Sequence, residues 1–371
     1  MKGFYFVNSD INNKRAHTFQ ILNTVEFINP FLSLELVFPE YKKDYNLKEL
    51  FSYYGLAGKV PVSFKSIFGI KESCVLAFLL FNISTSYFLF KKKIKKEADF
   101  IYFRSSFFFP LACFALAINT PFFYEPHRKP LSWSERIRDS FLAKFAAGLV
   151  VISDGLYQYY LKQNKNVLIA HDAVSLQRFD FELDKNEARQ KLNLSQNAIL
   201  GVYSGAVRKI KGIEIVFSAA RSLPSVNFEI VGPIGPEFEK HPVSDNIHLI
   251  GKKSQEIIPT YLKAADFLII PHPDNEYSQS PMKLFEYLAA GRPIISVALD
   301  NIKEVLPTEG NLLFEPSNSD SLVTVIKKYI EKKELYDREA QNNILVAREY
   351  TWEKRGEKIA RFIKQSKIKQ Q

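Results

Sequence analysis

Short apolar runs alternate along the chain with longer segments in which apolar residues recur at helical spacing. In the first half, the runs lie at residues 3–7, 34–38, 60–64, 100–103, 121–124, 149–153 and 167–170. Nearly continuous apolar runs of this length are typical of parallel strands that are buried on both faces, and the helical segments between them allow parallel connections. The alternation predicts an α/β domain with a doubly wound parallel sheet.

A second series of the same kind follows a break in the pattern. Residues 179–197 are rich in charge and lack strand character. The apolar runs then resume at 199–203, 228–231, 247–250, 267–270, 293–297 and 311–314, and two late helices are expected at 320–332 and 352–363. We therefore predict two Rossmann-like domains, at residues 1–180 and 181–350, followed by a C-terminal helical segment at 351–371.

The segment 277–297, with the sequence YSQSPMKLFEYLAAGRPIISV, carries the clearest helix boundaries in the chain. Ser280 and Pro281 are residue types preferred just before a helix and at its first position. Residues 282–290 are good helix formers or aromatics, and the stop signal begins at Gly291. A helix at 282–290 followed by a buried strand is predicted.

The start of this helix has the features of an anion site. Its free amides, with Lys283 in the first turn, attract negative charge. Glu286 lies one turn further on, where its carboxylate could accept two hydroxyl hydrogen bonds from a ribose. The residues alone leave another interpretation open, in which Ser280 and Pro281 only cap the helix and Glu286 pairs with Lys283 on a solvated surface.

Composition narrows the class of protein. The chain has 371 residues, 46% of them hydrophobic, with two cysteines and a net charge of +10. Cys74 and Cys113 both lie in apolar runs, so we expect buried thiols, no disulfide framework and a cytoplasmic location. The positive charge favours anionic partners. No nucleic-acid-binding module is visible, so we expect no nucleic-acid partner.

Residues 74–90 form an uncharged run near the lower length limit of a membrane span, and lysines follow at 91–93 and 95–96. Polar residues interrupt the middle of the run at Asn82 and Thr85. Because an α/β domain needs a crossover helix before its next strand, we expect a buried crossover helix rather than a span. The lysines are expected to contact an anionic membrane surface, which would make the protein peripheral at the inner face; a solvated loop is the alternative.

The stretch SPMKLFEYLAAGRPII closely resembles the donor-site segment of retaining GT-B glycosyltransferases in glycosyltransferase family 4, also called glycosyl transferases group 1. The resemblance implies two Rossmann-like domains that face a cleft, with the last helix folding back on the first domain. It makes Glu286 similar to the residue that holds the ribose of a nucleotide sugar. The family's earlier acidic residue, in the pattern E-x7-E, is replaced here by Ser278. The other donor contacts expected in this segment are Ser280, Pro281, Met282 and Lys283.

A second donor loop follows the run at 199–203. It lies at the carboxyl end of a strand, where an open α/β sheet places its ligand. From Gly205 to Gly212 it is similar to the family's G-x-x-x-x-x-K-G loop, with Lys211 as the matched lysine. Ala206 stands where the family often has arginine, so Arg208 is expected to supply that cation, with Lys209 as the second choice; a solvent-facing basic turn is the alternative. Further donor contacts are expected from Ser204, Gly205, Gly232 and Pro233.

In the first domain, the run at 121–124 leads into Glu125 and His127, which resemble the family's E-x-H. The resemblance favours His127 as a catalytic residue together with Arg208 and Lys211, although a structural histidine is the alternative. His171 is expected in the hinge between the domains. Acceptor contacts are expected from Arg15, His17 and Arg104.

No set of His, Cys, Asp and Glu residues has metal-ligand spacing, and the loop after the first strand lacks G-x-G-x-x-G, which counts against a dehydrogenase. We expect neither a metal nor a cofactor. The resemblance implies a retaining, metal-independent glycosyltransferase that moves a sugar from a nucleotide diphosphate sugar to a saccharide or lipid-linked acceptor in cell-surface polysaccharide or glycolipid synthesis. The alternatives are a nucleotide-sugar 2-epimerase of the same fold and a non-catalytic nucleotide-sugar-binding protein, for which Ala206 and Ser278 are the main evidence.

Overall fold

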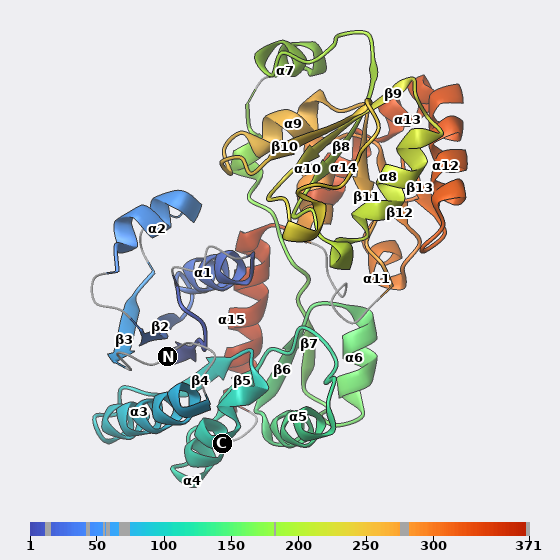
Figure 1. Cartoon of the computed structure of the whole chain (residues 1–371). Helices are drawn as coiled ribbons and strands as arrows, with labels where there is room; N and C mark the ends of the chain where they lie inside the picture. Colours follow the sequence, from blue (N-terminus) through green and yellow to red (C-terminus); the bar gives the residue numbers. More distant parts are fainter. Residues whose placement is uncertain are drawn as a thin grey trace. The chain divides into compact units, whose positions relative to one another are not determined.

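The structure is a computed structural model that describes residues 1–11, 16–41, 45–54, 56, 60–66, 75–181, 183–274 and 282–368. The chain forms two compact units (Figure 1). The first comprises Met1–His171 together with Trp352–Gln371, and the second comprises Asp172–Thr351. The units therefore divide after His171, whereas the sequence pattern placed the boundary after residue 180.

The first unit contains a parallel sheet in the order β3-β2-β1-β4-β5-β6-β7. Every apolar run predicted as a strand in this half forms one, so the predicted doubly wound sheet is confirmed. The strands are β1 (Lys2–Phe6), β2 (Ser33–Glu40), β3 (Val62–Ser66), β4 (Phe100–Phe103), β5 (Phe122–Tyr124), β6 (Gly148–Val151) and β7 (Val167–Ile169).

Helices cover both faces of this sheet (Figure 1). Tyr5 of β1 packs into the core shared with α1 (Ala16–Ile28) and α15 (Trp352–Ile368), whereas Phe4 and Phe6 point into the core on the opposite face. Such alternation explains why the strand is apolar at every position. The remaining helices of the unit are α2 (Leu47–Tyr54), α3 (Val75–Ile94), η1 (Ser106–Phe108), α4 (Phe109–Ala117), α5 (Trp133–Phe145) and α6 (Asp154–Leu161).

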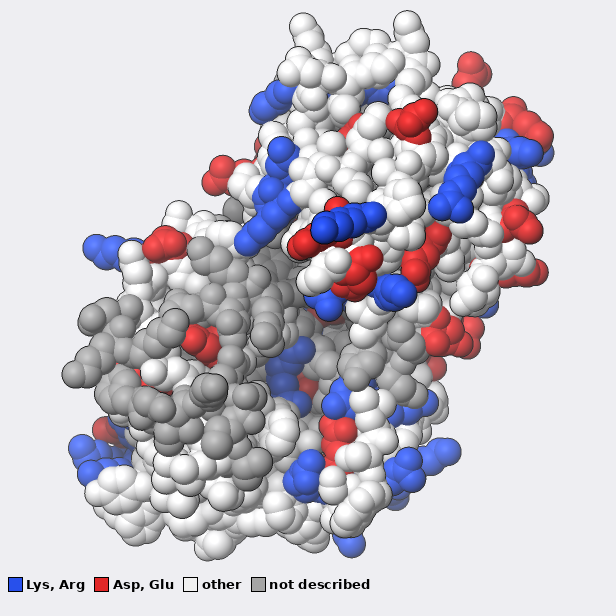
Figure 2. All heavy atoms as spheres, in the orientation of Figure 1, with Lys and Arg blue, Asp and Glu red and all other residues white. Residues whose placement is uncertain are grey.

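The segment with the ambiguous apolar run forms α3, the crossover helix between β3 and β4. Within the described residues, no helix is long and apolar enough to cross a membrane. The expectation of a buried helix is only half right, because Phe81 is 2% exposed whereas Ile83 and Tyr87 are 66% and 60% exposed. In Figure 2 the lower edge of the first unit, over α4, is largely free of charged side chains. Cys113 of α4 is a free, half-buried thiol rather than a fully buried one, and Cys74 lies outside the described residues.

The second unit contains a parallel sheet in the order β10-β9-β8-β11-β12-β13, which is again the predicted fold. Helix α10 spans Met282–Ala290, as its start and stop signals predicted. The strands are β8 (Ile199–Ser204), β9 (Val226–Val231), β10 (Ile247–Gly251), β11 (Phe267–Ile270), β12 (Ile294–Val297) and β13 (Leu312–Phe314). The other helices are η2 (Leu176–Phe179), α7 (Lys185–Lys191), η3 (Lys209–Lys211), α8 (Ile213–Arg221), η4 (Pro236–Phe238), α9 (Ile258–Ala264), α11 (Asp300–Lys303), α12 (Ser319–Glu331), α13 (Lys333–Glu339) and α14 (Asn342–Ala347).

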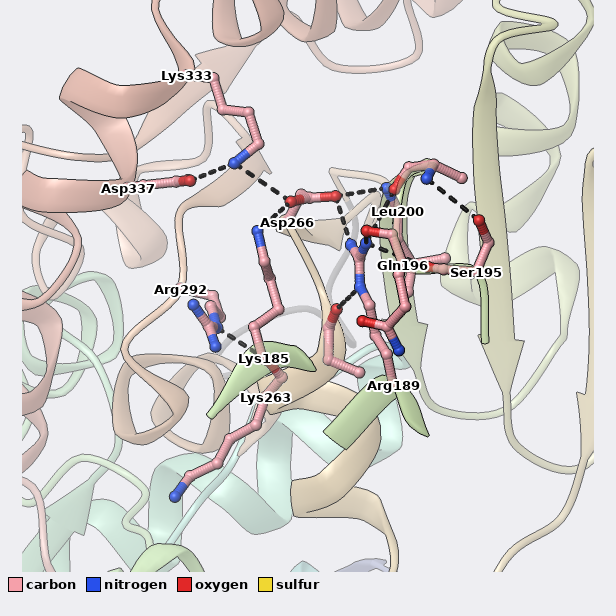
Figure 3. Close-up of polar contacts among 12 residues, drawn as sticks. Lys185, Arg189, Ser195, Gln196, Leu200, Lys263, Asp266, Arg292, Lys333 and Asp337 are labelled. Carbon is pink, nitrogen blue, oxygen red and sulfur yellow. Dashed lines mark hydrogen bonds and ion pairs between the residues drawn. The ribbon is translucent and has the colours of Figure 1, made fainter. Parts of the chain in front are cut away.

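A buried ion network fixes the amino edge of this second sheet (Figure 3). The guanidinium of Arg189 donates to Oδ2 of Asp266 at 2.6 Å and to the carbonyl of Ala264 at 2.9 Å. Asp266 also accepts from the amide of Leu200, at the start of β8, and from Lys185. Burial alone would raise the pKa of Asp266, but these donors hold it below its ordinary value. The network is structural and leaves the carboxyl edge of the sheet for a ligand.

Candidate active site

The second sheet has its switch point between β8 and β11, because the chain passes from β8 to β9 on one side and from β11 to β12 on the other. In open α/β sheets this point forms the ligand crevice at the carboxyl ends of the strands. The loops that follow β8 and β11 touch there. A Cβ atom added to Gly212 would lie 2.0 Å from the carbonyl oxygen of Pro271, so no larger residue fits without moving one loop.

Lys283 in the first turn of α10 brings a buried ammonium group to this crevice. Its Nζ is buried and has no hydrogen-bond partner among the described residues, and it lies 3.8 Å from the centroid of the Tyr203 ring. A Cβ atom at Gly205, whose φ is +149°, would lie 2.6 Å from this Nζ. Burial, followed by the charge of Lys211, lowers the pKa of Lys283 well below its usual value. The site thus contains a poorly compensated cation beside the glycine loop.

Lys211 and His272 complete a basic cluster with Lys283. Burial lowers the pKa of Lys211. The pKa of His272 lies well below its ordinary value because of burial and the charges of Lys283 and Lys211, so its ring is neutral at pH 7. Nδ1 of His272 is buried and has no hydrogen-bond partner within the described part of the chain. Two lysines and an imidazole whose charges act on one another are suited to a multiply charged anion such as a diphosphate.

Glu286 of α10 has a different partner from the one that its spacing suggested. Its Oε1 accepts a hydrogen bond of 2.6 Å from Nη1 of Arg178 in η2, so the alternative in which it pairs with Lys283 is wrong. Nη2 of the same guanidinium donates to the carbonyl and to the side chain of Gln255. Arg178 thereby orients the carboxylate through one oxygen. That Glu286 holds a ribose stays a prediction.

Arg208 lies apart from the buried lysines. Its side chain is 52% exposed, and its Nε donates to Oε1 of Glu237 at 2.9 Å. Lys209 is exposed as well, with its Nζ 3.9 Å from Glu214. Of the two predicted loop cations, Lys211 therefore lies in the basic cluster and Arg208 lies in an exposed ion pair.

The other predicted donor contacts fall into three groups. The amide of Ser204 donates to the Tyr287 hydroxyl oxygen at 2.7 Å, so that amide is already occupied. The carbonyl of Pro233 accepts from the amide of Val207 at 2.9 Å, and the neighbouring Gly232 donates to the carbonyl at the end of β10, which ties the loops after β8, β9 and β10 together. Met282 is the first residue of α10. Ser280, Pro281 and Ser278 lie outside the described residues.

A separate polar cluster lies at the carboxyl edge of the first sheet, around the buried carboxylate of Glu125. Its Oε1 accepts from Nη2 of Arg355 at 2.5 Å and contacts Nε2 of His127 at 2.8 Å, while Oε2 accepts from the Tyr102 hydroxyl at 2.7 Å. Burial favours the neutral acid, but the charge of Arg355 and the hydrogen bond from His127 hold the pKa of Glu125 well below its ordinary value. Because an ionised carboxylate only accepts hydrogen bonds, Nε2 of His127 carries the proton and Nδ1 is the acceptor.

His127 itself is neutral at pH 7. Burial and the nearby charge of Arg104 lower its pKa to about 3, against the opposing effect of Glu125. The ring is therefore suited to hydrogen bonding rather than to giving up a proton as an imidazolium. Of the predicted acceptor contacts, Nη1 of Arg104 donates to the carbonyl of His17 at 3.5 Å, and Nε2 of His17 lies 3.0 Å from the Ser9 hydroxyl. Arg15 lies outside the described residues.

Arg355 of α15 joins this cluster to the end of the unit. Besides Glu125, its guanidinium donates to the carbonyls of Ala170 and His171. His171, predicted as hinge structure, is the last residue of the first unit before the chain crosses to the second. Nothing in the described part of the chain groups three or more His, Cys, Asp or Glu residues so that they could hold a metal ion.

Comparison with known families identifies the segment that contains the basic cluster. Residues 184–346 match the family model of glycosyl transferases group 1. The resemblance seen in the sequence is therefore confirmed over most of the second unit, which contains Lys211, His272, Lys283 and Glu286.

Three curated relatives each match less than half of the chain. An uncharacterized glycosyltransferase of Methanocaldococcus jannaschii is 26% identical over 160 residues, which are 42% of this chain and 44% of the relative. A lipopolysaccharide 1,2-N-acetylglucosaminetransferase of Salmonella typhimurium is 25% identical over 46% of this chain and 49% of its own length. A putative teichuronic acid biosynthesis glycosyltransferase of Bacillus subtilis is 26% identical over 46% of this chain and 43% of its own length. The chain thus spans less than half the length of the curated relatives that it matches.

Solved structures match the whole chain in fold. A sucrose-phosphate synthase from Thermosynechococcus elongatus superposes with a TM-score of 0.81 at 14% identity, covering 98% of this chain and 99% of the other. Anabaena HepE in complex with UDP superposes with a TM-score of 0.77 at 15% identity, covering 98% of this chain and 100% of the other. A UDP-GlcNAc 2-epimerase from Neisseria meningitidis superposes with a TM-score of 0.63 at 12% identity, covering 98% of this chain and 100% of the other. The first two likenesses confirm the predicted GT-B fold.

Three residues of the candidate site were missed from the sequence. His272 lies just after β11, at the carboxyl edge of the sheet and within the segment that matches the family model. Its position directly after a predicted strand is the feature of the sequence that could have identified it. Arg178 precedes Glu286 by 108 residues, and Arg355 follows Glu125 by 230 residues, so no spacing rule relates either pair.

Proposed function

We propose that this chain is a glycosyltransferase that moves a sugar from a nucleotide diphosphate sugar to an acceptor in cell-surface polysaccharide or glycolipid synthesis. The observation that carries the proposal is the basic cluster of Lys211, His272 and Lys283 at the switch point of the second sheet, inside the segment that matches glycosyl transferases group 1. A buried ammonium group without a partner gains an ion pair when a diphosphate enters. The lipopolysaccharide and teichuronic acid relatives support the class of acceptor.

In this proposal the second unit binds the donor and stabilises the leaving group. Lys211 and Lys283 are fixed cations, and they act most strongly on the negative charge that develops on the diphosphate as the glycosidic bond breaks. The amides at the start of α10 point toward the same charge. Arg208 would have to exchange Glu237 for the diphosphate, so we assign the second cationic role to Lys283. Glu286, oriented by Arg178, accepts the ribose hydroxyls.

His127 is proposed to contact the transferred sugar as a neutral hydrogen-bonding group. Its Nε2 donates to Glu125, which leaves Nδ1 to accept from a sugar hydroxyl. Retention of anomeric configuration and independence from metal ions also belong to the proposal. The two lysines supply the positive charge that a divalent ion provides in other transferases. Activity in the presence of a chelator and the anomeric configuration of the product, measured by NMR, test these two points.

The acceptor is proposed to bind the first unit at Arg104 and His17, with Arg15 as the third predicted contact. Arg104 lies close to both His17 and His127. A lipid-linked acceptor would bring the chain to the inner face of a membrane.

The test of the donor site compares lysines of one loop and one helix. Lys211→Met and Lys283→Met should each lower turnover of the donor about a hundredfold or more, because each removes a charge that stabilises the transition state. Lys209→Met is the matched control, since Lys209 is exposed in the same loop. Release of nucleoside diphosphate from a panel of donors and saccharide acceptors is the measurement. Turnover near that of the wild type in both buried-lysine variants would contradict the proposal.

A nucleotide-sugar 2-epimerase is the second candidate, because one of the solved structures with this fold is a UDP-GlcNAc 2-epimerase. Conversion of the donor to its epimer without an acceptor would support that activity. Binding of the donor with neither conversion nor transfer would instead support a non-catalytic nucleotide-sugar-binding protein.

A further inference from the structure

Helix α3 buries its polar residues and exposes its apolar ones. Asn82 and Thr85, in the middle of the helix, are 3% and 0% exposed. Their side chains donate to carbonyls one turn earlier, Asn82 to Phe78 at 3.0 Å and Thr85 to Phe81 at 2.8 Å. The polar positions of the run therefore lie on the inner face, together with Ala77, Phe81 and Leu89, which pack into the core against the sheet.

The opposite face of α3 carries a continuous apolar stripe. Its residues recur at intervals of one, three or four, which places them on one side of a helix. Each is between 38% and 66% exposed. We call them the outer stripe: Leu76, Leu79, Leu80, Ile83, Tyr87, Phe90 and Ile94.

The neighbouring helix extends this surface. Phe107 is 48% exposed and its ring centroid lies 5.0 Å from that of Phe78, while Leu116 of α4 is 39% exposed. Exposed apolar residues that occur singly need no explanation, but a stripe of this length marks an interaction surface.

The charges next to the outer stripe are basic. Helix α3 contains no acidic residue and ends in a run of lysines. Lys92 pairs with Glu97, and Lys93 donates to the carbonyl of Asn119. Lys91 and Lys95 are exposed at the same end, and Nζ of Lys91 lies 4.4 Å from the centroid of Tyr87 in the stripe. The surface thus combines an apolar face with cations at one end.

We infer that the outer stripe of α3 inserts into the interfacial layer of a membrane that contains anionic lipid, with Lys91 and Lys95 on the headgroups. An exposed helix with an apolar face and lysines at its border has the chemistry of an in-plane membrane helix. A second copy of the chain fits less well, because its own α3 offers lysines and no carboxylate to these cations. The inference goes beyond the proposed function, since it depends on no donor or acceptor.

Vesicle flotation of the full chain at physiological salt tests the inference. Vesicles of phosphatidylcholine with phosphatidylglycerol should bind the wild type. The double variant Ile83→Glu/Tyr87→Glu should lower the partition coefficient about tenfold or more, because two apolar side chains no longer enter the interface. The matched control is Leu345→Glu, since Leu345 is 56% exposed on α14 in the second unit. All three positions are exposed, and equal thermal unfolding midpoints would show that the variants fold.

The lysines are tested separately from the stripe. Lys91→Glu/Lys95→Glu should weaken binding to the anionic vesicles and make it less dependent on salt, while leaving binding to pure phosphatidylcholine unchanged. Failure of the wild type to float with anionic vesicles would overturn the inference, as would equal flotation of the stripe variant and the wild type. A dimer in light scattering that the stripe variant converts to a monomer would show that a second copy, not lipid, covers α3.

Discussion

At the scale of single residues, the proposed donor site contains a buried lysine that has no hydrogen-bond partner among the described residues. Nζ of this residue, Lys283, is buried beside Tyr203, and Lys211 adds a like charge. A charge in such a place costs stability, and a bound anion would recover it. In the first unit, by contrast, the buried charge has partners, because the carboxylate of Glu125 contacts Arg355, His127 and Tyr102.

The first prediction concerns the stability cost of Lys283. Lys283→Met should stabilise the ligand-free protein at pH 7 by about 1 kcal/mol, because it removes a buried cation whose pKa is depressed, and methionine is also a good helix former. Urea unfolding measures the change. The control Lys209→Met should stay within about half a kcal/mol of the wild type, as expected for an exposed residue. A clear loss of stability in Lys283→Met would show that the ammonium has a stabilising partner.

The second prediction concerns pH and His127. The pKa of His127 is lowered to about 3 in the folded chain, whereas an unfolded histidine titrates near 6.5. Between these values only the unfolded state binds the proton, so folding stability falls as the pH drops below about 6.5. Between pH 7 and pH 5 the folded state should lose about 2 kcal/mol of stability through His127. The variant His127→Gln should lack this part of the pH dependence. Equal slopes of stability against pH for wild type and variant, in urea unfolding, would contradict the assignment.

At the scale of elements, each site is formed where loops leave the carboxyl ends of neighbouring strands. The loops after β8 and β11 make contact at Gly212 and Pro271, and α10 supplies Lys283 and Glu286 to that edge. In the first unit, the loop after β5 supplies Glu125 and His127. Helix α15 completes this second cluster although it belongs to the end of the chain. Arg355 of this helix thereby holds the carboxylate that contacts His127.

The third prediction follows from this role of α15. Arg355→Met should destabilise the first unit by about 3 to 5 kcal/mol, because Glu125 would stay buried without its guanidinium partner. The double variant Glu125→Gln/Arg355→Met should recover part of this loss in thermal unfolding, since no buried charge remains. Arg361→Met is the control, because Arg361 forms an exposed pair with Glu357 on the same helix. A loss no larger than that of the control would mean that the ion pair contributes little.

At the scale of the whole molecule, the sequence was sufficient to predict the fold and part of the candidate site. Apolar runs such as FIYF and FLII became strands because parallel sheets bury both faces, and Gly291 ended α10 where expected. Lys211 and Lys283 could be located because strand ends and helix starts fix where ligands bind.

The remainder depended on tertiary contacts. The pairs Arg178–Glu286 and Arg355–Glu125 join residues that are far apart in the chain, and local spacing carries no signal for them. The orientation of α3 was missed for a different reason. Its run is apolar almost throughout, so the pattern could not show which face meets the sheet, and only packing revealed that Thr85 points inward and Ile83 outward.

The measurement that most directly tests the donor site is calorimetric binding of nucleoside diphosphates and the corresponding monophosphates to the wild type, Lys283→Met and Lys209→Met. If Lys211 and Lys283 hold the diphosphate, at least one diphosphate should bind the wild type and Lys209→Met about tenfold or more tightly than its monophosphate, and Lys283→Met should lose that preference. A wild type that binds no diphosphate, or a Lys283→Met variant that keeps the full preference, would contradict the assignment of this site.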